Sequence, residues 1–460
     1  MASRRRSAIA RPASESHNEV ARKWVHIAFG AGALLLRYLS WWEAAIVAAA
    51  AVVFNIRLLR TLSRGRLHRA HEIDRDLPAG LVLYPLSVLI LILFLPSRLD
   101  IVAAAWGVLA AGDGAATLVG RRFGTRKWSW NRHKSVAGSL AMVVAGGMTG
   151  AFLAWWCRPA VIPPPYLWFS LFAPFVAALV AAGVETVPIR LDDNLSVPLT
   201  AASALWALSL VSEDLALAFL FSMPAALLVA LPANLAVAWI GHRIGGVTAS
   251  GAAAGVIIGT TIYVSTGWPG WLLLLAAFGA ATLSSRMGLE RKTLLGIAED
   301  RGGRRGAGNA VANTGIAAVA GLLSVVSYDQ LGGLIAFTAA LTAGASDTVA
   351  SEIGKAWGRR TWTLTPFARV TPGTSGAISL EGTAAGVVSA AALAALANGV
   401  GLIPAELIVV VVAGATAGAF AESLLAPTFE GAGLLNNDAL NLINTAIAAF
   451  AALALAGAGR

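Results

Sequence analysis

Acidic side chains are scarce in this apolar chain, and several of them concentrate in two groups. The chain has 460 residues, of which 57% are hydrophobic and only 13% are charged. Because ionised groups are costly inside a bilayer, acidic residues at membrane depth usually have a function. Each group adjoins a loop that is rich in Arg, Lys and Gly. The first group contains Asp113, Glu185, Asp192 and Asp193, and the second contains Asp347, Glu352, Glu381, Glu422 and Asp438.

These residue types are suited to phosphoryl transfer from a nucleotide. Carboxylates bind hard divalent cations, whereas Arg, Lys and backbone amides bind phosphate oxygens. Glycines allow the backbone to approach phosphates closely, and they recur at Gly112, Gly114, Gly120 and Gly124. Each of these features is weak evidence when taken alone, because loop arginines at a membrane surface are commonly anchors.

Long apolar segments must position both groups. The apolar runs do not alternate with polar residues, and they have the length that a helix needs to cross a hydrocarbon core of roughly 30 Å. We therefore expect an all-α, polytopic integral membrane protein. The sequence predicts about fifteen segments, at 22–39, 40–56, 79–97, 99–120, 135–156, 166–184, 196–211, 215–241, 247–266, 268–284, 309–326, 331–352, 375–398, 404–426 and 438–458.

The net charge of +10 is explained by topology. If the N-terminus is cytoplasmic and the sides alternate, only Arg37, Arg98, Arg158 and Arg460 fall on the other side. The other 30 of the 34 Lys and Arg are then cytoplasmic, as the positive-inside rule requires. Binding to nucleic acid is not needed to explain the charge. We expect the inner, cytoplasmic membrane of a bacterium, with the polar loops facing the cytoplasm.

Three motifs recur in the same order, which predicts a duplication. Seven crossings invert the chain, so one additional helix is needed for two copies to have the same orientation, unlike the inverted repeats of many transporters. The expected parts are a basic tail at 1–21, membrane domains at 22–211 and 247–460, and a connecting helix at 212–246. The recurring motifs are 112–114 with 345–348, 135–139 with 379–383, and Glu185 and 192–195 with Glu422 and 437–440.

The first half resembles the phytol kinases. The matching stretches are 112–116 (GDGAA), 120–124 (GRRFG), Asn131 with 134–139 (KSVAGS), 184–188 (VETVP) and 191–200 (LDDNLSVPLT). Phytol kinases are related to dolichol kinases and, more distantly, to CDP-diacylglycerol synthases. The resemblance implies phosphorylation of a prenyl alcohol dissolved in the membrane, with CTP as the phosphate donor and Mg²⁺ or Mn²⁺ as the metal.

The second half resembles the phytyl-phosphate kinases. The matching stretches are 345–355 (ASDTVASEIGK), 373–383 (GTSGAISLEGT), 422–423 and 436–441 (NNDALN). Together the two resemblances imply a fusion that converts a prenyl alcohol, such as phytol, to its monophosphate and then to its diphosphate. The implied partners are the prenyl alcohol, the prenyl monophosphate, a nucleoside triphosphate and the lipid bilayer.

The resemblances also assign roles to individual residues. The expected catalytic residues are Asp113, Lys134, Glu185, Asp347, Glu381 and Glu422. The expected nucleotide and phosphate ligands are Gly112, Gly114, Arg121, Arg122, Ser135, Gly138, Ser139, Lys355, Gly373, Thr374, Ser379, Gly382 and Thr383. The expected metal ligands are Asp113, Asp192, Asp193, Asn194, Asp347, Glu352, Asn437 and Asp438.

Three other interpretations remain open from the sequence. Asp192 and Asp193 could simply cap the helix that follows them. A membrane transporter would also have many segments and repeats, although its polar groups would lie at mid-membrane. A cytidylyltransferase that forms a CDP-lipid is the nearest enzymatic alternative, because the related CDP-diacylglycerol synthases share the need for CTP and metal.

Overall fold

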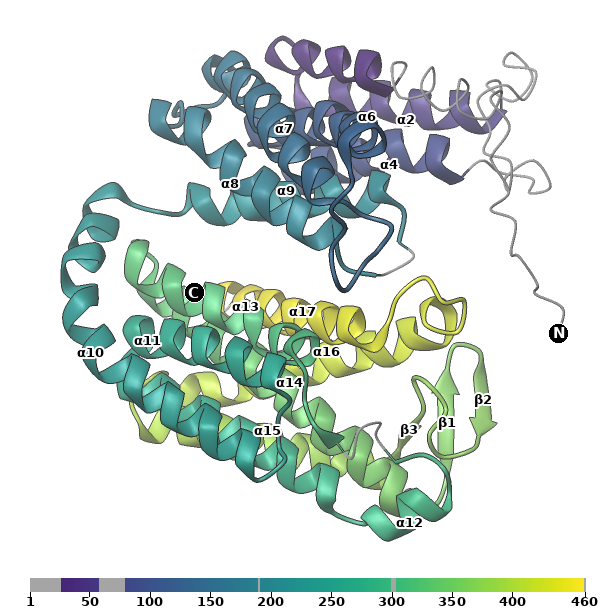
Figure 1. Ribbon diagram of the computed structural model, residues 1–460, viewed down its shortest axis with the longest axis vertical. Helices are drawn as coiled ribbons and strands as arrows, with labels where there is room; N and C mark the ends of the chain where they lie inside the picture. The colour runs from purple at the N-terminus through teal and green to yellow at the C-terminus, as the bar shows by residue number, and fades with distance from the viewer. Residues whose placement is uncertain (1–25, 58–78, 189–190, 299–302, 459–460) are drawn as a thin grey trace, which may run out of the picture. The chain divides into compact units, whose positions relative to one another are not determined.

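The computed structural model describes residues 26–57, 79–188, 191–298 and 303–458, and helices dominate it (Figure 1). The basic tail expected at 1–21 lies outside the described residues. The chain divides into two compact units, Met1–Ser209 and Leu210–Arg460. The helix expected to connect two membrane domains therefore belongs to the second unit.

The first unit is a helical bundle around an apolar core. Asp113 is the last residue of a π-helical stretch, η2, within the continuous span Leu99–Phe123. The wider turn of a π-helix is often found at functional sites. The elements are η1 (Gly30–Arg37), α2 (Trp41–Arg57), α4 (Ala79–Phe94), α5 (Leu99–Gly107), η2 (Val108–Asp113), α6 (Gly114–Phe123), α7 (Val136–Cys157), η3 (Arg158–Ala160), α8 (Leu167–Glu185) and α9 (Asp193–Ser209).

The second unit is built around one buried helix, α14. This helix contacts α11, α13, α15, α16 and α17, and its middle consists mainly of Ala, Gly and Thr, which allow neighbouring helices to approach closely. The helices of the unit are α10 (Glu213–Arg243), α11 (Ala249–Arg286), α12 (Leu289–Leu294), α13 (Ala307–Val326), α14 (Gln330–Trp357), α15 (Leu380–Gly399), η5 (Ala405–Leu407), α16 (Ile408–Phe429) and α17 (Asn437–Ala458).

A small antiparallel sheet interrupts the helices of the second unit. Strands β1 (Thr361–Leu364), β2 (Phe367–Val370) and β3 (Ile378–Ser379) pair in the order β2-β1-β3. The sheet occupies the polar connection between α14 and α15 (Figure 1). No strand was expected from the sequence, because these three strands are much shorter than the apolar runs that predict membrane helices.

The helical membrane fold is confirmed, but the number of spans is not. The described residues contain ten helices that are long and apolar enough to cross a membrane. The segments expected at 247–266 and 268–284 both lie in α11, which is broken at Gly267, where φ is 70°. Other expected segments correspond to shorter helices, such as α4 with 16 residues and α9 with 17. Apolar runs alone do not distinguish such helices from full spans.

Candidate active sites

Three carboxylates of the first unit converge, one from within a long helix and two from the ends of helices. Asp113 ends η2, Glu185 ends α8 and Asp193 begins α9. One oxygen from each lies within 4.8 Å of the others. Asp113 and Glu185 are buried, with exposed fractions of 2% and 9%. The chain thus brings together side chains that are up to 80 positions apart in the sequence.

Lys134 joins two of these carboxylates. Its Nζ atom lies 2.5 Å from Oε1 of Glu185 and 2.9 Å from Oδ2 of Asp193. Burial alone would lower the pKa of Lys134, but the charges of Asp193 and Glu185 outweigh that effect and raise the pKa above its ordinary value. Lys134 is therefore cationic at any physiological pH.

The loop that carries Lys134 is fastened to the end of α8. The side chains of Trp130 and Asn131 donate hydrogen bonds to the side-chain and backbone oxygens of Thr186, each at 3.1 Å. Immediately after Lys134, the Ser135 hydroxyl caps α7 by accepting a hydrogen bond from the backbone of Gly138. These bonds hold the lysine beside Glu185, because Thr186 follows Glu185 directly.

Asp113 also contacts a histidine that no motif singled out. The Nε2 atom of His26 lies 3.4 Å from Oδ2 of Asp113 and 3.3 Å from the carbonyl oxygen of Leu109. The imidazole packs edge-on against the ring of Tyr84, with 4.5 Å between the centroids. His26 lies within the first expected segment, 22–39, and a single histidine there gives no indication of this contact.

Other predicted residues of the first half are placed differently. Gly112 and Gly114 are buried, and a Cβ atom at either would approach Met142 or Ile27, so both glycines serve close packing. Arg121 and Arg122 are exposed in the last turn of α6, and Ser139 is half-buried near the start of α7. Asp192 accepts hydrogen bonds from the backbone and side chain of Asn194, which agrees with the capping interpretation.

The second unit contains a polar cavity of about 320 Å³. Its walls come from α14, α15, α16 and α17 and from the connection between α14 and α15. It thus gathers residues that the sequence had placed in four separate motifs. The predicted residues that line it are Asp347, Lys355, Gly373, Thr374, Ser379, Gly382, Thr383, Glu422 and Asn437.

Two carboxylates line this cavity from neighbouring helices. Asp347 lies in α14 and Glu422 lies in α16, and these two helices contact each other. The Oε2 atom of Glu422 is buried and accepts no hydrogen bond from the described residues. A buried carboxylate oxygen without a donor is costly, and a cation in the cavity would compensate for it. The pair therefore fits a divalent metal ion.

Lys355 is held at the cavity wall by Glu352. Oε1 of Glu352 lies 2.8 Å from Nζ of Lys355, and Oε2 lies 2.5 Å from Nζ of Lys292. Both oxygens of Glu352 thus face lysines, and Glu352 is not among the residues that line the cavity. The metal contact expected of Glu352 stays a prediction. Lys292 is fully buried, and no motif had indicated it.

Glu381 and Asp438 also lie apart from this cavity. Glu381 is half-buried in the first turn of α15 and is not among the lining residues. Asp438 packs against Gly308 of α13. The Oδ2 atom of Asp438 is so near that a Cβ atom added to Gly308 would lie only 2.2 Å from it. The cavity instead includes Arg305, Asn309 and other residues that sequence motifs did not indicate.

Comparison with known proteins identifies the family. The model of the DUF92 integral membrane proteins matches residues 232–449. An uncharacterized membrane protein of Synechocystis sp. is 34% identical over 257 residues, which are 55% of this chain and 95% of the relative. The chain belongs to the DUF92 family. No solved structure matches it.

Two plant proteins also match this DUF92 family member. Protein VTE6 of Arabidopsis thaliana is 36% identical over 219 residues, which are 45% of this chain and 65% of the relative. The farnesol kinase of the same plant is 33% identical over 196 residues, which are 40% of this chain and 63% of the relative. Both are named as chloroplastic. The chain therefore covers less than two thirds of the length of each plant relative.

The two units of this DUF92 protein share a local geometry. The hydroxyl of Ser135 accepts from the backbone of Gly138 at 3.1 Å, and the hydroxyl of Ser379 accepts from the backbone of Gly382 at the same distance. A Cβ atom added to Gly138 or to Gly382 would lie no more than 2.9 Å from a backbone oxygen of the long helix that precedes that glycine in the chain. Each unit thus fixes the start of one helix tightly against another beside its carboxylates.

The charges of the first site also suit a divalent cation. Three carboxylates and the ammonium group of Lys134 leave a net charge of about −2, and carboxylate oxygens are preferred ligands of Mg²⁺. Such a site could hold the metal and the negatively charged phosphates of a nucleotide. Both sites therefore contain the groups that phosphoryl transfer requires.

Proposed function

We propose that this protein is an isoprenoid lipid kinase with two sites. The first unit phosphorylates a prenyl alcohol such as phytol, and the second phosphorylates the resulting prenyl monophosphate. The observation that carries the proposal is the pairing of buried carboxylates with lysines, Lys134 beside Glu185 and Lys355 at the cavity of Asp347. The similarity to a protein named farnesol kinase supports the chemistry and the class of substrate.

In the first reaction, the hydroxyl oxygen of the alcohol attacks the γ-phosphorus of a nucleoside triphosphate. The bond from that phosphorus to the β–γ bridging oxygen breaks, the nucleoside diphosphate leaves, and the hydroxyl proton is released to solvent. Lys134 stabilises the charge on the transferred phosphoryl group. Asp113, Glu185 and Asp193 would hold a divalent cation, which when bound neutralises phosphate charge. Positioning and neutralisation dominate, because the transition state is loose.

In the second reaction, a phosphate oxygen of the prenyl monophosphate attacks the γ-phosphorus of a second nucleoside triphosphate. The bond from that phosphorus to the β–γ bridging oxygen breaks, the nucleoside diphosphate leaves, and the lipid product is the prenyl diphosphate. Lys355, Thr374 and the backbone around Gly373 bind phosphate oxygens in the cavity. Asp347 and Glu422 would hold the metal in this unit.

The arrangement of two such sites in one chain follows from a parallel duplication. The shared hydrogen bonds of Ser135 and Ser379 support this origin, and so does the recurrence of the motifs. A fused second site would also meet a raised local concentration of the monophosphate. We infer CTP as the donor and the cytoplasmic face of a bacterial inner membrane as the location, both from the family resemblance and the charge distribution.

Mass spectrometry of lipid products tests the proposal. Purified protein is given CTP, magnesium and a panel of prenols that includes farnesol, geranylgeraniol and phytol. We expect a prenyl monophosphate followed by a diphosphate from at least one prenol. CTP labelled at the γ- or α-position distinguishes a kinase from a cytidylyltransferase, because a kinase transfers only the γ label to lipid. Absence of any phosphorylated prenol would overturn the proposal.

A further inference from the structure

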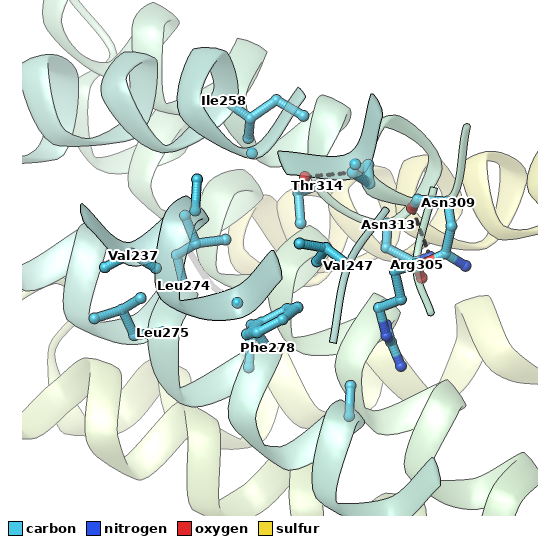
Figure 2. A pocket seen from close by; sticks show the side chains of 18 of the residues that line it. Val237, Val247, Ile258, Leu274, Leu275, Phe278, Arg305, Asn309, Asn313 and Thr314 are labelled. Atoms are coloured by element: carbon cyan, nitrogen blue, oxygen red, sulfur yellow. Dashed lines mark hydrogen bonds between the residues drawn. The ribbon is translucent and has the colours of Figure 1, made fainter. Parts of the chain in front are cut away.

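A second, apolar pocket lies beside the polar cavity of the second unit. Its volume is about 130 Å³, and α10, α11, α13 and α14 form its walls. Figure 2 shows the side chains that line it, with Val237, Leu274, Leu275 and Phe278 on one side and Ile258 across from them. All four helices are long and apolar enough to span a membrane. The pocket therefore lies among helices able to span a membrane, and its lining is suited to an apolar chain.

The polar end of this pocket adjoins the polar cavity. Arg305 and Asn309 line both spaces, and Figure 2 places them at the same end as Asn313. Asn313 is 7% exposed, and its Nδ2 atom donates to the backbone oxygen of Asn309 at 2.9 Å. The Oδ1 atoms of both asparagines are buried and accept no hydrogen bond from the described residues. Polar atoms therefore mark the end at which the two spaces adjoin.

We propose that the apolar pocket holds the isoprenyl chain of the substrate of the second site. This inference rests on the proposed function, and it names where that substrate lies. The phosphate of a prenyl monophosphate would lie in the polar cavity near Arg305, and the first isoprene units would pass Asn309. The rest of the chain would then extend among the apolar side chains of α10 and α11.

This assignment gives α10 a role. From the sequence, the segment at 212–246 was expected only to connect the two membrane domains. In the structure, α10 packs against α11 and α13 and contributes Asn234, Val237, Ala238 and Gly241 to the pocket. Because it forms one wall, α10 sets the width of the space that is available to the chain.

Gly255 is the position at which this width can be changed cleanly. It lies in α11 and lines the pocket. A Cβ atom on Gly255 would have no heavy atom within 4 Å, so a larger side chain can be placed at this lining position without displacing backbone. Gly279 provides a matched control, because it lies in the same helix, is equally open, and does not line the pocket.

The first experiment measures chain-length selectivity in Gly255→Leu and Gly279→Leu. Binding of geranylgeranyl and geranyl monophosphates, with twenty and ten carbons, is measured by native mass spectrometry in detergent. We expect Gly255→Leu to weaken binding of the longer chain by about tenfold, the equivalent of 1.4 kcal/mol, and to leave the shorter chain within about twofold. Gly279→Leu should match the wild type. An equal loss for both chains, or no loss, would overturn the pocket assignment.

The second experiment needs no variant. A farnesyl monophosphate analogue with a diazirine on its terminal isoprene unit is irradiated with the wild-type protein, and the labelled peptides are sequenced. Labels in the pocket-lining helices α10, α11, α13 or α14 support the assignment, whereas labels confined to helices that do not line the pocket overturn it. If the probe labels the pocket but the protein forms no prenyl diphosphate, the pocket assignment stands and the kinase proposal fails.

Discussion

The Nζ atom of Lys292 lies 2.5 Å from Oε2 of Glu352, and both side chains are only 1% exposed. Lys292 also donates to the backbone oxygens of Ser284 and Ser285 at the end of α11. The other oxygen of Glu352 holds Lys355, which lines the polar cavity. A buried ion pair thus connects α12 to α14 and fixes the lysine that we assign to phosphate binding.

We expect Lys292→Met to destabilise the second unit. The change leaves the buried carboxylate of Glu352 with one lysine in place of two, and removal of one partner from a buried ion pair costs about 3 kcal/mol. Thermal unfolding of purified protein in nanodiscs measures the loss. The double variant Lys292→Met with Glu352→Leu should recover part of it, because no unpaired charge remains. Lys127→Met, at an exposed lysine, should leave the unfolding temperature unchanged. Equal stability of Lys292→Met and wild type would contradict this role for the pair.

Lys134→Met should reduce phosphorylation of the alcohol by about a hundredfold, the scale seen when one electrostatic donor is removed from an active site. Lys134→Arg should retain more activity, because it keeps the positive charge. The assay is kcat/KM for the prenol at saturating nucleotide. Conversion of added prenyl monophosphate to diphosphate serves as the internal control, since it depends on the second unit.

The raised pKa of Lys134 also predicts the pH dependence of the first step. A lysine whose folded pKa is raised stabilises the folded state fully below its ordinary pKa of about 10.4. That contribution is lost only as the pH rises through the still higher folded value. Between about pH 7 and 9, the activity of the first step should therefore depend on pH in the same way in the wild type and in Lys134→Arg. If the activity of the wild type declined in that range and the activity of Lys134→Arg did not, the assignment would be refuted.

Asp113→Asn and Asp347→Asn should separate the two steps. Asp113→Asn removes one carboxylate from the cluster of the first unit, so alcohol phosphorylation should fall below detection while added monophosphate is still converted. Asp347→Asn acts on the cavity of the second unit, so the monophosphate should accumulate. Lipid mass spectrometry measures both products. If either substitution stopped both steps equally in folded protein, the division of labour would be wrong.

Magnesium binding can be measured without catalysis. A ligand at a hundred times its dissociation constant stabilises the folded state by about 2.7 kcal/mol. We expect magnesium to raise the unfolding temperature of the nucleotide-free protein, and the double variant Asp113→Asn with Glu185→Gln to lose part of this rise. Glu43→Gln, at a carboxylate that accepts hydrogen bonds from Ser40, is the control outside the cluster. An identical magnesium response in wild type and double variant would exclude these carboxylates as ligands.

The recurring motifs of the sequence indicate which polar residues lie together, but not which motif residues serve packing. Asp113, Lys134 and Glu185 lie in recurring motifs, and the structure brings them together. Gly112 lies in the same motif, but its burial against Met142 makes it a packing residue. A motif records that a residue type is needed, and it does not distinguish a phosphate contact from a close helix approach.

Contacts between distant positions carried no signal in the sequence. Lys292 lies 60 positions before Glu352 in the sequence, and His26 is likewise distant from Asp113 along the sequence. Neither pair therefore forms a local pattern. The fold class was predictable because hydropathy and helix length depend on adjacent residues. The number of spans was not, since the break of α11 at Gly267 depends on one backbone angle.

The shared geometry of the two units gives the last prediction. At Gly124 a Cβ atom would lie 2.0 Å from the backbone oxygen of Gly120, and at Gly358 it would lie 2.4 Å from that of Gly354. Alanine cannot be accommodated at either position without displacing the end of α6 or α14. We therefore expect Gly124→Ala to impair only alcohol phosphorylation, and Gly358→Ala to impair only phosphorylation of the monophosphate, each by at least about tenfold.

Two open glycines provide the controls for this comparison. Gly183 in α8 and Gly399 in α15 have no heavy atom within 4 Å of an added Cβ, so alanine at either should leave both steps within about twofold of wild type, as for most substitutions away from packed sites. Rates of the two steps are compared at equal amounts of folded protein. Parallel, step-specific losses would mean that the two units use one local geometry for one kind of chemistry. A loss in only one unit would mean that the resemblance between Gly124 and Gly358 is confined to the backbone and has no equivalent role in catalysis.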